Sequence, residues 1–173
     1  MSWKAFLLRT EGKAPDQEKF VRYTESWMRP AEMEPGAEFR VWSTDELQPT
    51  SSVPAHVAAK SVALIEPEAA DAFHHRLLRA YFTENRTISD WAVLAELAGD
   101  VGLDRGEFLA FTAERERALS EEVIGEHNEA IGQGITAVPT MVLNEVLPVP
   151  GAQDVETVAG WIERLLDAST QGG

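Results

Sequence analysis

The chain has 173 residues, enough for one domain with a sizeable core, and 44% of them are hydrophobic, including five Trp and seven Phe, as is typical of a folded globular protein. Its formal net charge of −14 at pH 7 argues against nucleic acid and anionic membrane surfaces as partners, because a polyanion would be repelled before specific contacts form. The chain contains no cysteine, so its own residues form no disulfide and supply no thiolate nucleophile or thiolate metal ligand.

The first third of the chain predicts one strand, one helix and a long loop. Trp3–Arg9 is a short apolar run rich in aromatic residues, which is typical of a strand. Large apolar residues then recur at helical spacing over residues 16–29, and the proline directly after them is expected to end that helix. Residues 30–52 contain several Pro and Gly residues and predict a loop, which Phe39 and Trp42 attach to the body of the protein.

The middle of the chain predicts a series of helices, because apolar residues recur at helical spacing after residues that favour caps. Ser89 is expected to cap the third of them, and Asp104 with Glu107 three residues later forms a capping box for the fourth. The predicted helices cover residues 52–65, 67–81 and 89–98, then begin at Asp104 and again at Ser120, the last of them reaching Ile131 and ending at Gly132–Gly134.

The last forty residues predict a hairpin followed by a helix. Thr140–Leu143 and Val146–Val149 flank Asn144-Glu145, which suits a tight turn between two strands. Pro148 places the second strand at an edge of its sheet. Asp154 is then expected to cap a final helix that buries five apolar side chains, those of Val155, Val158, Ile162, Leu165 and Leu166.

The segment from Gly134 to Asn144 and the Gly-Ala-Gln turn at residues 151–153 resemble the thioredoxin-fold oxidoreductases of the DsbA/FrnE type. In that family a Val-Pro-Thr loop with a cis proline precedes a strand, and the turn introduces the last helix. A cis bond there turns the chain sharply and leaves neighbouring backbone groups free to pair with an extended substrate. The resemblance therefore implies that Pro139 is cis and that Val138, Pro139 and Thr140 are the substrate-binding residues.

Other stretches extend the resemblance over nearly the whole chain. Ser52–His56 and Ala80–Asp90 are similar to the helical insertion of the FrnE branch, and Trp3–Leu8 is similar to the second strand of the family. The implied fold is α/β and thioredoxin-like of the DsbA type, with a large all-helical insertion and an N-terminally truncated sheet. Residues 1–10 and 134–173 are then the remnant of the thioredoxin-like domain, and residues 11–133 are the helical insertion domain.

The family's first strand, its active-site loop and the helix after it have no counterpart in this sequence. That loop carries a nucleophilic Cys, or a Ser in the glutathione-dependent isomerase branch, so the sequence offers no catalytic residue and we expect no thiol chemistry from this chain. A naturally shortened protein and a wrongly assigned start both explain the difference. Glutathione is implied as a cofactor only if the complete protein belongs to the isomerase branch.

Two functions remain as alternatives. The first is a DsbA/FrnE-like thiol-disulfide oxidoreductase, or isomerase, represented here by a chain that cannot perform the chemistry itself. The second is a redox-inactive protein that binds a peptide or partner through the cis-proline groove or an open sheet edge. The expected partners are an extended peptide, a small-molecule substrate, or a second copy bound at the edge that the missing strand exposes. The apolar run at the N-terminus is too short for a signal peptide and no later segment approaches a membrane span, which predicts a cytoplasmic protein.

Other groups of residues could carry chemistry, but each has a simpler explanation. Two clusters that contain His lack a pair of His residues four positions apart, which favours surface pairing over metal binding. A Ser/His combination lacks the nucleophile-elbow sequence of hydrolases, and a Gly-rich segment follows a helix and precedes a strand, the reverse of a phosphate loop. These groups are Asp71, His74 and His75; Glu126, His127 and Glu129; Ser51 and Ser52 with His56; and Gly132–Gly134.

Overall fold

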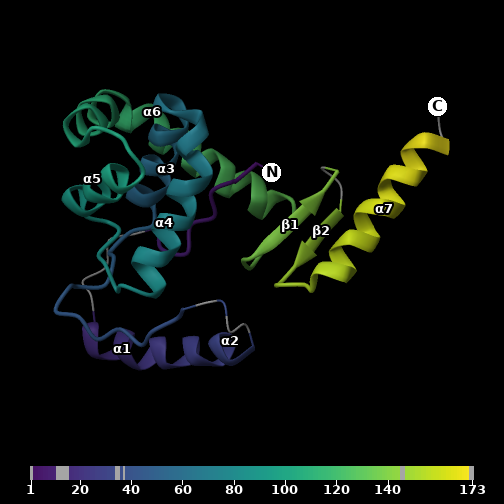
Figure 1. Cartoon of the computed structure of the whole chain (residues 1–173), viewed down its shortest axis with the longest axis horizontal. Helices are drawn as coiled ribbons and strands as arrows, with labels where there is room; N and C mark the ends of the chain where they lie inside the picture. Colours follow the sequence, from purple (N-terminus) through teal and green to yellow (C-terminus); the bar gives the residue numbers. More distant parts are fainter. Residues whose placement is uncertain (1, 11–15, 34–35, 37, 145–146, 172–173) are drawn as a thin grey trace. The chain divides into compact units, whose positions relative to one another are not determined.

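The computed structural model describes residues 2–10, 16–33, 36, 38–144 and 147–171. The chain divides into two compact units, Met1–Glu126, which is helical, and His127–Gly173, which holds a hairpin and the last helix (Figure 1). The sequence-based division grouped residues 1–10 with residues 134–173, whereas the structure places them in the same unit as the helices. Within the described part of the chain, no helix is both long and apolar enough to cross a membrane.

Aspartate caps define where three helices of the first unit begin. The side chains of Asp16, Asp90 and Asp104 accept hydrogen bonds from backbone N–H groups in the first turn that follows each of them, at 3.0, 2.7 and 2.9 Å. The elements are α1 (Gln17–Thr24), the 3-10 turn η1 (Glu25–Trp27), α2 (Met28–Met33), α3 (Val53–Ile65), the 3-10 turn η2 (Pro67–Ala69), α4 (Ala70–Phe82), α5 (Trp91–Asp100) and α6 (Arg105–Gly132), whose last turns belong to the second unit.

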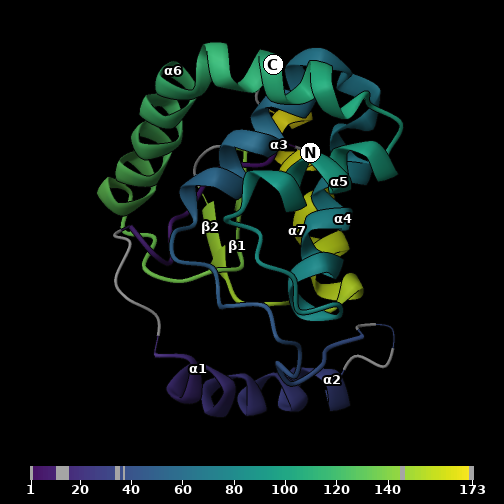
Figure 2. The same cartoon turned by 90° about the vertical axis from the view of Figure 1, so that its left-hand side faces the viewer.

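The main core of the helical unit lies between α3, α4, α5 and the beginning of α6, which are grouped together in Figure 2. Phe73, Leu94, Leu97 and Phe108 are fully buried there, as is Val62 on α3. Small residues on α3, α4 and α5 allow these helices to approach one another closely, and they include Ala58, Ala80 and Ala98. Burial of apolar surface on this scale is the dominant stabilising term for such a helical unit.

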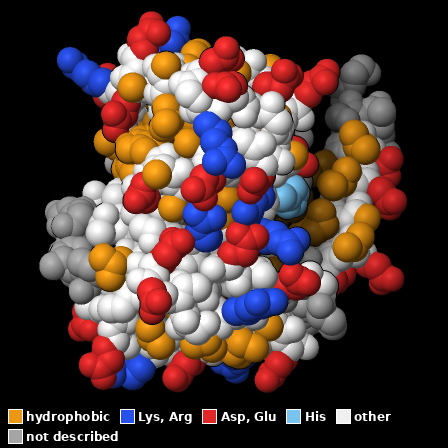
Figure 3. All heavy atoms as spheres, turned by 60° about the vertical axis from the view of Figure 1, so that its left-hand side comes forward, with side chains coloured by type: hydrophobic (Ala, Val, Ile, Leu, Met, Phe, Trp, Pro, Cys, Tyr) orange, Lys and Arg blue, Asp and Glu red, His pale blue; other side chains and the backbone are white. Residues whose placement is uncertain are grey.

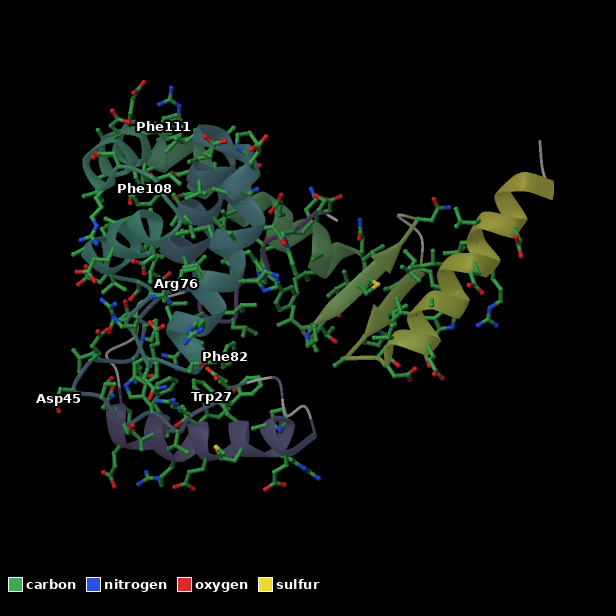
Figure 4. The ribbon with its side chains drawn as sticks, in the orientation of Figure 1. Trp27, Asp45, Arg76, Phe82, Phe108 and Phe111 are labelled. Atoms are coloured by element: carbon green, nitrogen blue, oxygen red, sulfur yellow. The ribbon has the colours of Figure 1, made fainter. Side chains whose placement is uncertain are left out.

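A second core consists of aromatic side chains and attaches the α1–α2 segment to the end of α4. The Trp27 ring lies 4.9 Å from the Phe82 ring and 5.2 Å from the Tyr81 ring (Figure 4). Trp42 is 1% exposed and its ring lies 5.1 Å from that of Phe20, which confirms that this aromatic residue attaches the long loop to the body. Burial raises the pKa of Tyr81 to about 12.

The predicted strand at Trp3–Arg9 is wrong. These residues run in an irregular extended conformation and pack on the helices, with Ala5 and Leu7 buried against Val57, Leu119 and Val123. The short apolar run that predicted a strand buries Ala5 and Leu7 against a helical surface instead of in a sheet. The segment therefore belongs to the core of the helical unit.

Three predicted helix boundaries also need correction. The predicted break before Ser120 is absent because no Gly or Pro interrupts the chain between Glu107 and Val123, and α6 runs through it. Asp90, not Ser89, caps α5, and the Ser89 hydroxyl instead accepts a hydrogen bond from the Thr50 N–H group at 3.2 Å. Pro30 does not end the helical segment, because η1 restarts it and Pro30 then falls in the first turn of α2, where no N–H group is needed.

The predicted hairpin is confirmed in the second unit, although Glu145 and Val146 lie outside the described residues. Strand β1 (Thr140–Leu143) pairs antiparallel with β2 (Leu147–Pro150), and helix α7 (Val155–Gln171) follows. Asp154 caps α7 as predicted, accepting hydrogen bonds from the Thr157 N–H and hydroxyl groups at 2.8 and 2.7 Å. Hydrogen bonding by Thr157 lowers the pKa of Asp154.

The second unit buries little apolar surface. Among its described residues only Leu143 and Val149 are buried hydrophobic side chains. The expectation that α7 buries its apolar side chains is wrong for three of them, since Val155, Ile162 and Leu166 are 84%, 43% and 61% exposed. The two-stranded sheet is too small to cover the apolar side of an amphipathic helix of this length.

Candidate functional site

The three sequence-predicted site residues lie together where the chain enters β1. The Val138–Pro139 peptide bond is cis, the conformation expected for Pro139. Val138 is 43% exposed, Pro139 is exposed, and the Thr140 hydroxyl donates a hydrogen bond to the Ala137 carbonyl oxygen at 2.7 Å. The three residues therefore form an accessible bend directly before the strand.

Glycines on both sides hold this bend in place. Gly134 has a φ of +79° after the end of α6, and the Ile135 N–H group donates to the Ala130 carbonyl oxygen at 3.0 Å, which is the C-cap arrangement expected at a helix end. Gly151, also at φ +79°, follows β2 and donates its N–H group to the Pro139 carbonyl oxygen at 2.8 Å. Positive φ values of this kind are open to glycine without steric cost.

The hairpin register decides which way the backbone groups of β1 point. Residues that exchange both backbone hydrogen bonds alternate along an antiparallel pair with residues that exchange none. Val142 faces Pro148 and Thr140 faces Pro150, and a proline has no N–H group to donate, so these two pairs are the ones without hydrogen bonds. The N–H and C=O groups of Thr140 and Val142 therefore point away from β2, along the other edge of β1.

That edge of β1 is open within the described part of the chain. The sheet there has only two strands, and the Val142 side chain beside the edge is 39% exposed. Trp3–Leu8, which the resemblance assigned to a nearby strand of the sheet, is in the helical unit. Two residues of the edge thus offer a donor and an acceptor each, in a region that carries no strand partner.

Glu126 fixes the Trp3–Arg9 segment to the helices. Its carboxylate, only 11% exposed, accepts the Ala5 N–H group at 2.8 Å and the Lys60 ammonium group at 2.9 Å, and it lies 3.3 Å from the Lys4 ammonium group. Burial opposes ionisation, but the hydrogen bonds from Ala5 and Lys60 outweigh it and lower the pKa of Glu126. This role of Glu126 was not predicted from the sequence, although an acidic residue among apolar α6 positions was a signal for it.

Several other residues that the sequence offered as candidates form contacts with neighbouring groups. The Trp3 indole stacks on the His74 ring at 3.7 Å, and His75 lies 3.7 Å from Asp71. The Ser52 hydroxyl accepts the Arg9 N–H group at 3.1 Å. No group of three or more His, Asp or Glu residues that could hold a metal ion occurs among the residues described. Acidic and basic side chains elsewhere pair on the surface, as on the face in Figure 3.

The model of the DSBA-like thioredoxin domain family matches residues 2–163. The chain belongs to this family. In this family member, the helical unit and the hairpin occur together with a cis proline at residue 139, and the sequence contains no cysteine. No curated protein matches the chain.

Solved structures of family members share the fold. A Nitrosomonas europaea protein assigned as a protein disulfide isomerase superposes with a TM-score of 0.72 at 20% identity, over 94% of this chain and 79% of that one. The cytosolic disulfide reductase DsbM of Pseudomonas aeruginosa, solved with GSH, gives 0.63 at 21% identity, over 87% and 76%. A Streptomyces coelicolor protein assigned as a DsbA oxidoreductase gives 0.66 at 27% identity, over 86% and 61%. The fold is thus DsbA-like, with a helical insertion and a small sheet.

Proposed function

We propose that this family member performs no thiol–disulfide exchange through its own residues and instead binds an extended polypeptide along the open edge of β1, with Val138, Pro139 and Thr140 at one end of the binding segment. The observation that carries the proposal is the combination of a chain without cysteine and a strand whose outward backbone groups have no partner strand among the described residues. Thiol exchange needs a thiolate, which no residue here supplies.

The chemistry of the edge supports an extended ligand. A polypeptide in β conformation pairs its backbone with the N–H and C=O groups of Thr140 and Val142, which is the addition of a strand to a sheet. Such pairing depends little on the sequence of the ligand, whereas exposed apolar side chains at Val138 and Val142 select apolar residues. The net charge of −14 favours ligands that are neutral or basic.

The second candidate function is that of an oxidoreductase or glutathione-dependent isomerase, which the family suggests. The DsbM structure contains GSH, but a mixed disulfide with glutathione needs a protein thiol, and this chain has none. The residues present therefore do not fit a covalent glutathione complex. We also place the protein in the cytoplasm and in the FrnE branch, in line with the cytosolic DsbM neighbour and with the sequence of its insertion.

The test uses reduced, carbamidomethylated ribonuclease A, a basic polypeptide that stays unfolded and has no free thiol. We expect saturable binding by the protein in microscale thermophoresis. Val142→Pro removes one outward N–H group but none of the hairpin hydrogen bonds, and it should weaken binding by about tenfold, the equivalent of about 1.4 kcal/mol. Leu166→Lys, on the exposed side of α7, is the matched control and should bind like the unmodified protein.

Two results contradict the proposal. One is an equal loss of binding in both variants, which would mean that exposed apolar surface and not the strand edge is responsible. The other is acceleration of insulin reduction by dithiothreitol in the presence of the protein, since a chain without cysteine should leave the background rate unchanged. Circular dichroism of each variant verifies that the helices are intact.

A further inference from the structure

We infer that the open edge of β1 is also a dimer interface, in which β1 of one copy pairs antiparallel with β1 of a second copy. The inference rests on the open edge of the proposed function, and it names a specific occupant for it. The resulting sheet has the order β2-β1-β1-β2 and a twofold axis that passes between the two Met141 residues. Its basis is the different chemistry of the two edges of the hairpin.

The outer edge of β2 cannot accept another strand well. Pro148 and Pro150 occupy the positions whose backbone nitrogens point away from β1, so this edge offers no N–H donor within β2. Prolines at such positions are a common protection against edge-to-edge association. The edge of β1 has no equivalent protection, because Thr140 and Val142 both keep their donors and neither is charged.

Charge favours association at β1 in an otherwise acidic molecule. Residues 130–144 contain no charged side chain, whereas the whole chain carries a net charge of −14. Two copies that approach through most other surfaces bring like charges together. Along β1 they meet apolar and hydroxyl side chains instead, and burial of Val142, 39% exposed in one copy, adds a hydrophobic contribution.

The edge is also self-complementary in register. When Thr140 of one copy faces Val142 of the other, the twofold axis places Val142 of the first opposite Thr140 of the second. Both pairs consist of residues whose N–H and C=O groups point outward, so each pair exchanges two backbone hydrogen bonds. The two Met141 side chains then lie directly opposite each other, in a pair without hydrogen bonds and with Cα atoms about 4.5 Å apart.

The register predicts a charge-swap experiment at Met141, which is 36% exposed. Met141→Lys and Met141→Glu each place like charges face to face across the axis, which is destabilising in a cross-strand pair. Each variant alone should dimerise about tenfold more weakly than the unmodified protein, and an equimolar mixture should recover the dimer as a Lys–Glu heterodimer. Leu166→Lys is the control for general loss of exposed apolar surface and should leave dimerisation unchanged.

Sedimentation equilibrium over about a hundredfold concentration range measures the association. The contact between two short strands is below the standard interface size, so we expect a dissociation constant of roughly 100 µM. The inference is overturned if the unmodified protein stays monomeric throughout this range. It is equally overturned if the two Met141 variants associate as the unmodified protein does, or if their mixture recovers nothing.

The same experiments separate this inference from the proposed function. Met141→Lys keeps the outward backbone groups, so as a monomer it should still bind the unfolded ribonuclease. If the unmodified protein is monomeric but binds the polypeptide, the dimer is refuted and the proposed function stands. If it dimerises as described but does not bind the polypeptide, the proposed function fails and the dimer stands. Competition between dimerisation and polypeptide binding is expected when both hold, because they use the same edge.

Discussion

Glu126→Gln should detach the N-terminal segment from the helices. The substitution preserves shape but removes the charge that holds the Ala5 N–H group and the Lys60 ammonium group, and hydrogen bonds to charged groups contribute about 1.5–3 kcal/mol each. The Gln amide group can still accept one of them, so we expect a loss of about 2–3 kcal/mol in the free energy of unfolding. For a chain of 173 residues this lowers Tm by about 5–10 °C.

Glu122→Gln provides the matched control. Glu122 is 55% exposed and pairs with Lys60 at 2.8 Å, so its replacement should cost only about 0.5 kcal/mol. Thermal unfolding followed by circular dichroism measures both variants, and hydrogen exchange at the Ala5 amide reports on the segment directly. Equal Tm values for the two variants, with unchanged Ala5 protection in Glu126→Gln, would refute the role that we assign to Glu126.

The lowered pKa of Glu126 adds a pH dependence to this prediction. A carboxylate whose folded pKa lies below its ordinary value of 4.5 stabilises the fold above that value, and the contribution is lost as the pH falls through the folded pKa. Unmodified protein should therefore lose stability on acidification below about pH 5 more steeply than Glu126→Gln does. The two stability curves should converge at low pH, and parallel curves would contradict the assignment.

Three further substitutions test other parts of the helical unit. Burial under Trp3, together with the charges of neighbouring histidines, lowers the pKa of His74. Trp3→Ala should therefore raise the pKa of His74 towards 6.5 in an NMR titration. An unchanged pKa would mean that the stack of Trp3 on His74 does not form in solution. Asn85 is 2% exposed, has a φ of +54° and accepts a hydrogen bond from the Ser43 N–H group at 3.1 Å. Asn85→Ala should therefore lower the free energy of unfolding in urea by about 2–3 kcal/mol. A loss below about 1 kcal/mol would refute this role of Asn85. Phe108→Ala leaves a cavity at a fully buried position and should lower the free energy of unfolding in urea by about 3–5 kcal/mol. A much smaller loss would show that the core collapses into the cavity.

The sequence predicted most helices and the hairpin because those features depend on local rules. Asp104 and Asp154 are followed by amphipathic patterns, and both cap helices in the structure. The hairpin needs only two short apolar runs around a turn. The bend at Pro139 was predicted from the resemblance and not from the residues themselves, and the structure has the same cis bond.

The errors arose where two tertiary environments accept the same local pattern. Ala5 and Leu7 alternate with more exposed residues equally well on a helical surface and in a sheet, so the choice depends on contacts such as that with Glu126. The apolar side of α7 predicted burial, yet Ile162 and Leu166 are exposed because the described sheet is too small to cover them. The resemblance predicted an open sheet edge, but the backbone groups that this edge of β1 presents could be identified only from the hairpin register.

The distribution of buried residues gives the two parts of this fold different freedom to vary. All three core clusters lie in the helical unit, between Ala5 and Val123, while the described part of the second unit buries only Leu143 and Val149 among its hydrophobic residues. Substitutions in the helices meet close packing and should mostly be rejected by selection. The hairpin and α7 can accept many more changes, so new binding specificities can evolve there without loss of the fold.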